Sequence, residues 1–177
     1  MEHTSAYGNT SLVDFISIFK SEGISSDWIQ VNNNRARTNG TGSGMDTNGS
    51  FIMLGDWGGK YQEAKNNIGV NPGQVGIGAA SGNHIRVEDN QMYSQLIDGI
   101  SNVAFYSWKN PIDAPNCSNH IYENNIANWI YGKHDQPNNY GNQNIAWSNG
   151  SCGLSHQILL SNTDEDTTMG PEIWNTW

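Results

Sequence analysis

Short hydrophobic runs separated by glycine, asparagine and serine dominate the pattern of this chain. The runs are rich in β-branched and aromatic residues, which is typical of strands. They predict strands at residues 27–31, 51–54, 75–79, 85–87, 103–108, 145–147 and 157–160, and an edge strand in the aromatic tail, residues 171–177. Three tryptophans stand in apolar alternations and are predicted to lie in the core: Trp108, Trp129 and Trp147.

Two other segments carry helix-forming residues. Residues 57–67 include the run Tyr61-Gln-Glu-Ala-Lys, and residues 91–100 form a second candidate helix. Residues 12–19 fit either a helix or a strand, because their apolar positions satisfy both periods. No internal repeat and no linker stand out in the sequence, and we expect residues 110–144 to be irregular.

The amide-rich segment between Trp129 and Trp147 is the strongest candidate site. Its Gln-Pro-Asn-Asn turn contains Pro137, and a cis peptide bond there would hold the flanking side chains in one direction. Side-chain amides in such a turn suit either the hydroxyls of a sugar or a hard cation. The predicted ligand-binding residues are Gln136, Asn138, Asn139, Tyr140, Gln143 and Asn144, with the ring of Tyr140 available for stacking.

The order of these segments resembles the C-type lectin-like domain. The matching pieces are Tyr61–Asn66 and Asn90–Leu96 for two helices, Val103–Trp108 for a central strand, and Asn128–Asn144 for a long ligand-binding loop. The resemblance covers roughly residues 51–162. It implies an α+β fold that is mostly β, with two short helices and long ordered loops.

The chain departs from that family where calcium is bound. Calcium-binding members carry Glu-Pro-Asn or Gln-Pro-Asp, followed by Trp-Asn-Asp on the next strand, whereas this loop has Gln-Pro-Asn-Asn and no Trp-Asn-Asp at the expected place. A Ca²⁺ ion in the loop would therefore need carboxylates from elsewhere, since amides alone bind it weakly. The predicted ligands are Asp135, Asn138, Asp164 and Asp166, and an alternative ion loop consists of Asp46, Asn48 and Ser50.

Composition limits the class of protein. A length of 177 residues suits one domain, residues 1–177, and with no signal peptide at its start we expect it to belong to a larger secreted protein. The net charge of −9 with only 8 lysines and arginines argues against nucleic acid and anionic membrane surfaces. No apolar run is long enough for membrane insertion. Cys117 and Cys152 either form a disulfide or remain free thiols.

These observations favour a secreted or cell-surface adhesin module rather than an enzyme. The expected ligand is a cell-surface glycan, bound with the help of Ca²⁺ by a monomeric module, and the alternative ligand is a peptide or protein terminus. A metal-dependent hydrolase is the alternative from another class, because the motifs around Asp56, Asn83 and His84 resemble fragments of metallophosphatase motifs. A purely structural or ice-binding module is a third possibility.

Overall fold

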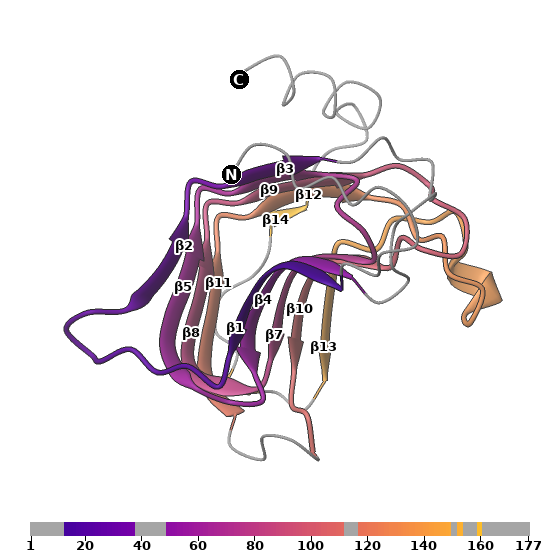
Figure 1. Cartoon of the computed structure of the whole chain (residues 1–177). Helices are drawn as coiled ribbons and strands as arrows, with labels where there is room; N and C mark the ends of the chain where they lie inside the picture. Colours follow the sequence, from indigo (N-terminus) through magenta and orange to yellow (C-terminus); the bar gives the residue numbers. More distant parts are fainter. Residues whose placement is uncertain (1–12, 38–48, 112–116, 150–151, 154–158, 161–177) are drawn as a thin grey trace.

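The computed structural model describes residues 13–37, 49–111, 117–149, 152–153 and 159–160, and over these residues nearly all regular structure is strand. The chain passes in turn through three sheets and then starts again, so that it forms a parallel β-helix (Figure 1). We call each passage a rung. All strand pairs between rungs are parallel.

Four rungs contribute one strand to each sheet, and a fifth rung contributes two described strands. The first three rungs are β1 (Asp14–Phe19), β2 (Ile29–Asn32) and β3 (Arg35–Arg37); β4 (Ser50–Asp56), β5 (Lys60–Lys65) and β6 (Ile68–Val70); and β7 (Val75–Ala80), β8 (Gly82–Glu88) and β9 (Gln91–Ser94). The last two are β10 (Val103–Trp108), β11 (Cys117–Glu123) and β12 (Ile126–Trp129), and then β13 (Ala146–Asn149) and β14 (Leu159–Leu160).

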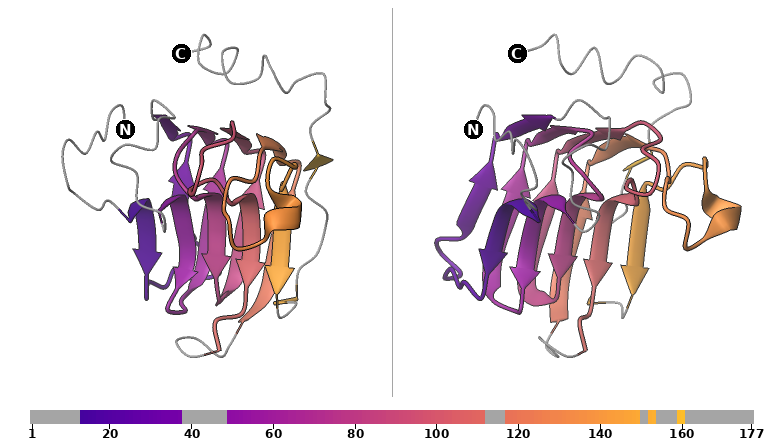
Figure 2. Two further views of the ribbon diagram at one scale, coloured as in Figure 1. Left: turned by 90° about the vertical axis from the view of Figure 1, so that its right-hand side faces the viewer. Right: turned by 45° about the vertical axis from the view of Figure 1, so that its right-hand side comes forward.

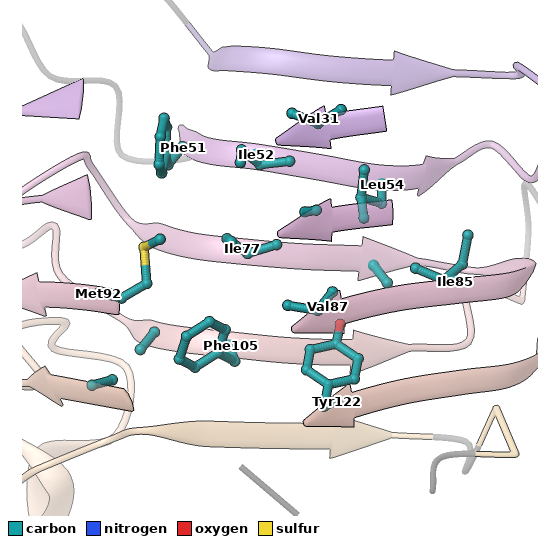
Figure 3. Close-up of a cluster of buried hydrophobic side chains, with 14 of the residues drawn as sticks. Val31, Phe51, Ile52, Leu54, Ile77, Ile85, Val87, Met92, Phe105 and Tyr122 are labelled. Atoms are coloured by element: carbon teal, nitrogen blue, oxygen red, sulfur yellow. The ribbon is translucent and has the colours of Figure 1, made fainter. Parts of the chain in front are cut away.

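The three sheets enclose the core. Sheet 1 has the strand order β1-β4-β7-β10-β13, sheet 2 the order β11-β8-β5-β2, and sheet 3 the order β14-β12-β9-β6-β3. Because the strands are parallel and in register, each inward position meets the same position of the next rung. In sheet 1, for example, Ile52, Ile77 and Phe105 are neighbours and are fully buried (Figure 3).

A column of asparagines lies at the turn between sheets 2 and 3. In each of the first four rungs one asparagine precedes the sheet 3 strand, and we call Asn34, Asn67, Asn90 and Asn125 the asparagine ladder. The side-chain oxygen of each of the last three accepts bonds of 2.9–3.1 Å from the backbone N–H and the side-chain NH₂ of the ladder residue before it. The NH₂ group also donates to a backbone carbonyl of the preceding rung, as from Asn90 to Ala64 at 2.9 Å. The buried amides are therefore satisfied by the ladder itself.

The residue before each ladder asparagine has a left-handed backbone. These residues are Asn33, Asn66, Asp89 and Asn124, with φ between 54° and 60°. Asparagine and aspartate adopt this conformation more readily than other residues with a side chain. A local motif, Asn or Asp followed by Asn, thus makes the sharp turn in every one of these rungs.

The structure confirms several predicted strands and overturns the predicted fold class. The α+β fold with two helices is wrong, and nothing in the parallel β-helix supports the likeness to C-type lectin-like domains. The segments expected to be helical form β5 and β9, and residues 14–19 form β1. The expectation of no internal repeat was wrong, and β11 and β12 lie in the region expected to be irregular. The tail, residues 171–177, lies outside the described residues.

Strand pairing explains why the helix prediction failed for β5. Gln62 and Ala64 point inward and are fully buried, while Lys65 forms ion pairs on the outside of the sheet, with Glu88 at 3.0 Å and Glu63 at 3.3 Å. This alternation matches the neighbouring strands β2 and β8, with which β5 pairs on both sides. Intrinsic helix propensity is a weak preference that such tertiary contacts override.

We expect Asn90→Ala to destabilise the protein by about 3 kcal/mol or more, since it leaves several buried ladder groups without partners. The measurement is urea denaturation followed by circular dichroism. Asn138→Ala, at an exposed loop position, is the matched control and should change the free energy of unfolding by less than about 0.5 kcal/mol. Equal effects of the two substitutions would contradict a structural role of the ladder.

Candidate functional site

The outer face of sheet 1 carries a row of side chains that crosses all five strands. Register places Ser17, Met53, Gly78, Tyr106 and Trp147 side by side, and we call this the outer row. The row alternates with the buried row that contains Ile77, so its side chains point away from the core. Figure 2 (left) looks onto these strands from outside.

Tyr106 and Trp147 form an aromatic platform at one end of the outer row. The two rings meet edge to face, with centroids 5.9 Å apart and an interplanar angle of 76°. The Tyr106 ring lies over Gly78, where a Cβ atom would come within 2.6 Å of the ring. Its hydroxyl contacts the sulfur of Met53 at 3.1 Å. The glycine therefore makes room for the tyrosine, which in turn supports the indole of Trp147.

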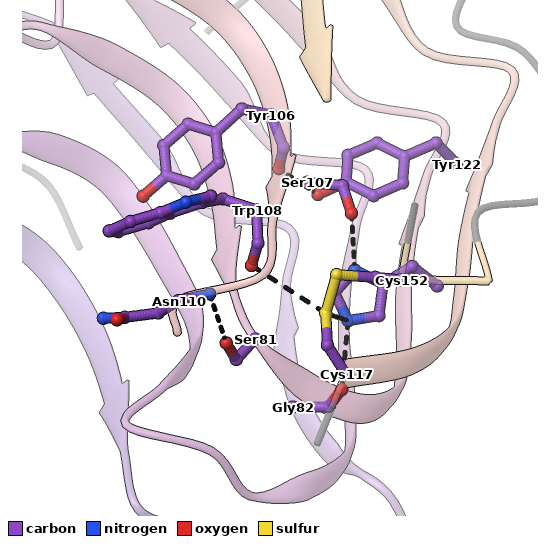
Figure 4. The surroundings of a disulfide bond; sticks show 10 residues. Ser81, Gly82, Tyr106, Ser107, Trp108, Asn110, Cys117, Tyr122 and Cys152 are labelled. Atoms are coloured by element: carbon purple, nitrogen blue, oxygen red, sulfur yellow. Dashed lines mark hydrogen bonds between the residues drawn. A yellow bond between two sulfur atoms is a disulfide. The ribbon is translucent and has the colours of Figure 1, made fainter. Parts of the chain in front are cut away.

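The tryptophan predictions had mixed outcomes. Trp129 is fully buried, as expected. Trp147 is 46% exposed, so its prediction as a core residue was wrong, because β13 is the edge strand of sheet 1 and its side chains face solvent. Trp108 is half-buried and lies near Tyr106 (Figure 4).

Two carboxylates on the first two rungs, those of Asp14 and Asp56, act on the hydroxyl group of Tyr106. Burial raises the pKa of the Tyr106 hydroxyl, and the negative charges of Asp14 and Asp56 raise it further. Asp14 also accepts a 3.0 Å bond from the backbone N–H of Ser50, and Asp56 accepts a 3.3 Å bond from the hydroxyl of Ser17. The phenol therefore stays protonated, and this part of sheet 1 combines an aromatic ring with carboxylates that accept hydrogen bonds.

A second pair of aromatic side chains lies where β1 and β4 end. Phe19 and Trp57 are about half exposed, at 50% and 45%, and their ring centroids are 6.0 Å apart. The ammonium group of Lys20 lies 4.9 Å from the Trp57 ring centroid and 5.2 Å from that of Phe19. Exposed aromatic surface is thus present at both ends of sheet 1.

The predicted amide loop is folded and projects beside sheet 1, but its amides bond mainly within the protein. Pro137–Asn139 form a 3₁₀ turn, labelled η1, and the peptide bond before Pro137 is trans, not cis. Side-chain bonds join Asn139 to Gln136 at 2.8 Å, Gln143 to Asn128 at 3.3 Å, and Asn144 to the carbonyl of Asn102 at 2.8 Å. These residues stabilise the loop, and whether they also bind a ligand stays a prediction.

Tyr140 belongs to a surface cluster that sequence reasoning missed. Its hydroxyl donates to Asp98 at 2.8 Å, and this bond is the main reason that its pKa is raised. The same carboxylate oxygen lies 2.9 Å from Nε2 of His134, whose ring stacks on Tyr140 with centroids 5.2 Å apart. Nothing in the sequence pointed to Asp98, because it comes from a different loop.

Of the four predicted calcium ligands, Asp135 and Asn138 lie within the described residues. Asp135 accepts a hydrogen bond from Tyr131, and burial followed by this bond raises the pKa of Tyr131 to about 12. Ser50, from the alternative ion loop, is fully buried at the start of β4. The remaining predicted ligands, Asp46, Asn48, Asp164 and Asp166, lie outside the described residues.

The residues that suggested a metallophosphatase have partners in different sheets. Asp56 ends β4 in sheet 1, where it bonds Ser17. His84 lies in β8 of sheet 2. The centroid of its ring is 4.8 Å from that of Tyr61 and 6.4 Å from that of Trp28. These contacts give no support to a shared metal centre.

A buried polar corner joins sheets 1 and 2. Cys117 and Cys152 form a disulfide, which decides between the two cysteine alternatives (Figure 4). Beside it, Nδ1 of His120 lies 2.8 Å from the hydroxyl of Ser107, and burial lowers the pKa of His120 to about 4. Ser107 is only 3% exposed and His120 is fully buried, so a substrate cannot reach this serine as a nucleophile.

We expect Gly78→Ala to destabilise the protein by about 1–3 kcal/mol, because the new methyl group overlaps the Tyr106 ring. In a Tyr106→Ala background the same change should cost much less. The measurement is a double-mutant cycle, in which urea denaturation gives the free energy of unfolding of each variant. A coupling energy near zero would show that the added methyl group does not clash with the Tyr106 ring.

His120 makes stability depend on pH. Its folded-state pKa of about 4 lies below the ordinary value of 6.5, so the unfolded chain binds the extra proton first. The neutral imidazole therefore contributes its full share of the free energy of unfolding above pH 6.5. This share is lost as the pH falls toward 4, and the total loss is roughly 3 kcal/mol. Urea denaturation at several pH values should show this slope in the wild type and in His84→Gln, but a reduced slope in His120→Gln.

Comparisons with protein families, curated proteins and solved structures found no match to this chain.

Proposed function

We propose that this protein is an extracellular binding module that holds an extended glycan against the outer face of sheet 1. The observation that carries the proposal is the Tyr106–Trp147 platform, an exposed indole that packs edge to face against a second ring. Large aromatic rings that are held rigid offer contact area at low entropic cost, and their faces suit the apolar faces of sugar rings.

The dimensions of the outer row favour a polymer. Neighbouring strands are about 4.8 Å apart, so a row across five strands extends over roughly 19 Å. The acceptors that Asp14 and Asp56 supply lie toward the first two rungs, while the platform lies on the last two. A linear glycan could stack on the rings and donate hydroxyl bonds to the carboxylates, whereas a single sugar would reach only one end.

The projecting loop supports the same proposal. In Figure 2 (left) it lies at the upper end of sheet 1, beside β13. Tyr140 is 37% exposed there, and the same loop carries the exposed residues Gln136, Asn138, Asn139 and Gln143. A ligand on the platform would pass this loop, so the predicted loop residues form the edge of the proposed site. Contacts of this kind are individually weak, and several copies in a parent protein would raise the avidity.

The disulfide and the acidic composition support an extracellular location, since disulfides persist mainly in oxidising compartments. Only 8 lysines and arginines oppose 17 acidic residues, which disfavours nucleic acid as a partner. Among the described residues no helix is long and apolar enough to span a membrane.

Trp147→Ala should weaken glycan binding at least tenfold, which corresponds to about 1.4 kcal/mol. The measurement is a glycan array with the purified chain, followed by calorimetry on the best oligosaccharide. Trp28→Ala is the matched control, because this tryptophan lies by sheet 2, and it should leave the affinity unchanged. If no glycan binds, or if both variants lose binding equally, the proposal is wrong.

The same experiment separates the calcium and hydrolase hypotheses. Glycan binding that relies on aromatic rings and carboxylates should persist in EDTA. If Ca²⁺ orders the loop, chelation should instead lower both the glycan affinity and the melting temperature of the protein. Appearance of new reducing ends in the bound oligosaccharide would indicate a hydrolase instead of a binding module.

A further inference from the structure

Three potential metal-binding side chains meet at the polar corner between sheets 1 and 2. A ligand atom from each of Cys117, His120 and Cys152 lies within 4.8 Å of the other two. Cys117 and His120 are both in β11, and Cys152 follows β13, so the cluster joins the fourth and fifth rungs (Figure 4). In the oxidised protein the disulfide uses both sulfur atoms, and no cation can bind there.

The imidazole of His120 is already oriented toward the sulfur atoms. Its Nε2 atom lies 3.8 Å from the sulfur of Cys117 and 3.2 Å from the carbonyl oxygen of Gly82. Its Nδ1 atom is held 2.8 Å from the hydroxyl of Ser107. Histidines that bind metals are usually fixed in this way, with one nitrogen on the metal and the other on a hydrogen-bond partner.

We propose that reduction of the disulfide converts this corner into a binding site for one thiophilic cation such as Zn²⁺. Two molecules of a thiol reductant reduce the bridge to two protein thiols and are themselves oxidised to one disulfide. The cation then displaces the two thiol protons and binds both thiolates. Nε2 of His120 supplies the third ligand atom. Its proton, which faces the carbonyl oxygen of Gly82 in the oxidised protein, must therefore move to Nδ1, where it is donated to the hydroxyl oxygen of Ser107.

The chemistry of these atoms selects the kind of cation. Two thiolates and an imidazole suit Zn²⁺ or Cu⁺, and they do not suit Ca²⁺, which prefers oxygen ligands. The Cα atoms of the two cysteines are 4.7 Å apart in the bridged protein, so both sulfur atoms can bind one cation if the backbone keeps this geometry on reduction. Disulfide and cation exclude each other, and the redox state of the surroundings therefore determines which of them closes the corner.

The test uses the full chain, reduced anaerobically and titrated with Co²⁺ as a spectroscopic substitute for Zn²⁺. We expect one equivalent per chain to bind with a sulfur-to-cobalt charge-transfer band. The oxidised chain should show no band, and reoxidation should release the ion. A reduced chain that keeps its strand circular dichroism but gives no band would overturn the proposal, and so would a chain that unfolds on reduction with or without the metal.

Variants identify the ligands. Ser107→Ala should weaken Co²⁺ binding by about 10–100-fold, because it removes the group that orients the imidazole. His120→Gln should weaken it further, and Cys117→Ser with Cys152→Ser should abolish the charge-transfer band. His84→Gln, in the neighbouring strand β8, is the matched control and should bind like the wild type. An affinity unchanged by His120→Gln would show that the histidine is not a ligand and would overturn the proposed site.

Discussion

The structure depends on one constraint, which is that each rung must stack on the next in register. The asparagine ladder enforces this at the turn between sheets 2 and 3, since each amide bonds both the backbone and the side chain of its neighbour. A shift of one rung by a single residue would bury ladder groups without partners and turn inward side chains such as Val87 outward. Hydrophobic burial supplies the stabilisation, but the ladder selects the register.

The candidate binding surface is a consequence of that register. The outer row exists because equivalent positions of successive rungs lie side by side, and so Tyr106 and Trp147 meet although they are far apart in the sequence. The described loops between sheets 3 and 1, which follow β6, β9 and β12, do not have to pair with a neighbouring rung. One of them projects beside the row and carries Tyr140. A regular face and an irregular loop therefore combine in one surface.

At the polar corner, stacking of the rungs brings polar side chains together inside the protein instead of on its surface. Ser107, His120 and Gly82 come from three strands in two sheets, and their bonds replace hydrophobic contact at the point where the sheets meet. The disulfide closes the same corner next to the fifth rung. Glycan binding on the outside of sheet 1 and cation binding at this corner use different residues, so each can be present without the other.

The sequence alone determined the local features. Residues 51–54, 75–79 and 103–108 are predicted strands because short apolar runs with β-branched and aromatic residues favour this structure. The structure contains β4, β7 and β10 at these positions. Tertiary structure decided what these strands do together. Pairing on both sides made β5 a strand despite its helix-forming residues.

The asparagine ladder and the Tyr106–Trp147 platform could not be predicted from the sequence, and the reason is physical. Ladder asparagines are 33, 23 and 35 residues apart, so loops of unequal length conceal the repeat in a chain rich in asparagine. The available signal was an Asn or Asp before each ladder residue and a buried residue three positions earlier, as Val87 stands before Asn90. The chain itself encodes turns and strands, but only the stacking of rungs brings Tyr106 to Trp147 and Cys117 to Cys152, because parallel contacts join residues that no local pattern relates.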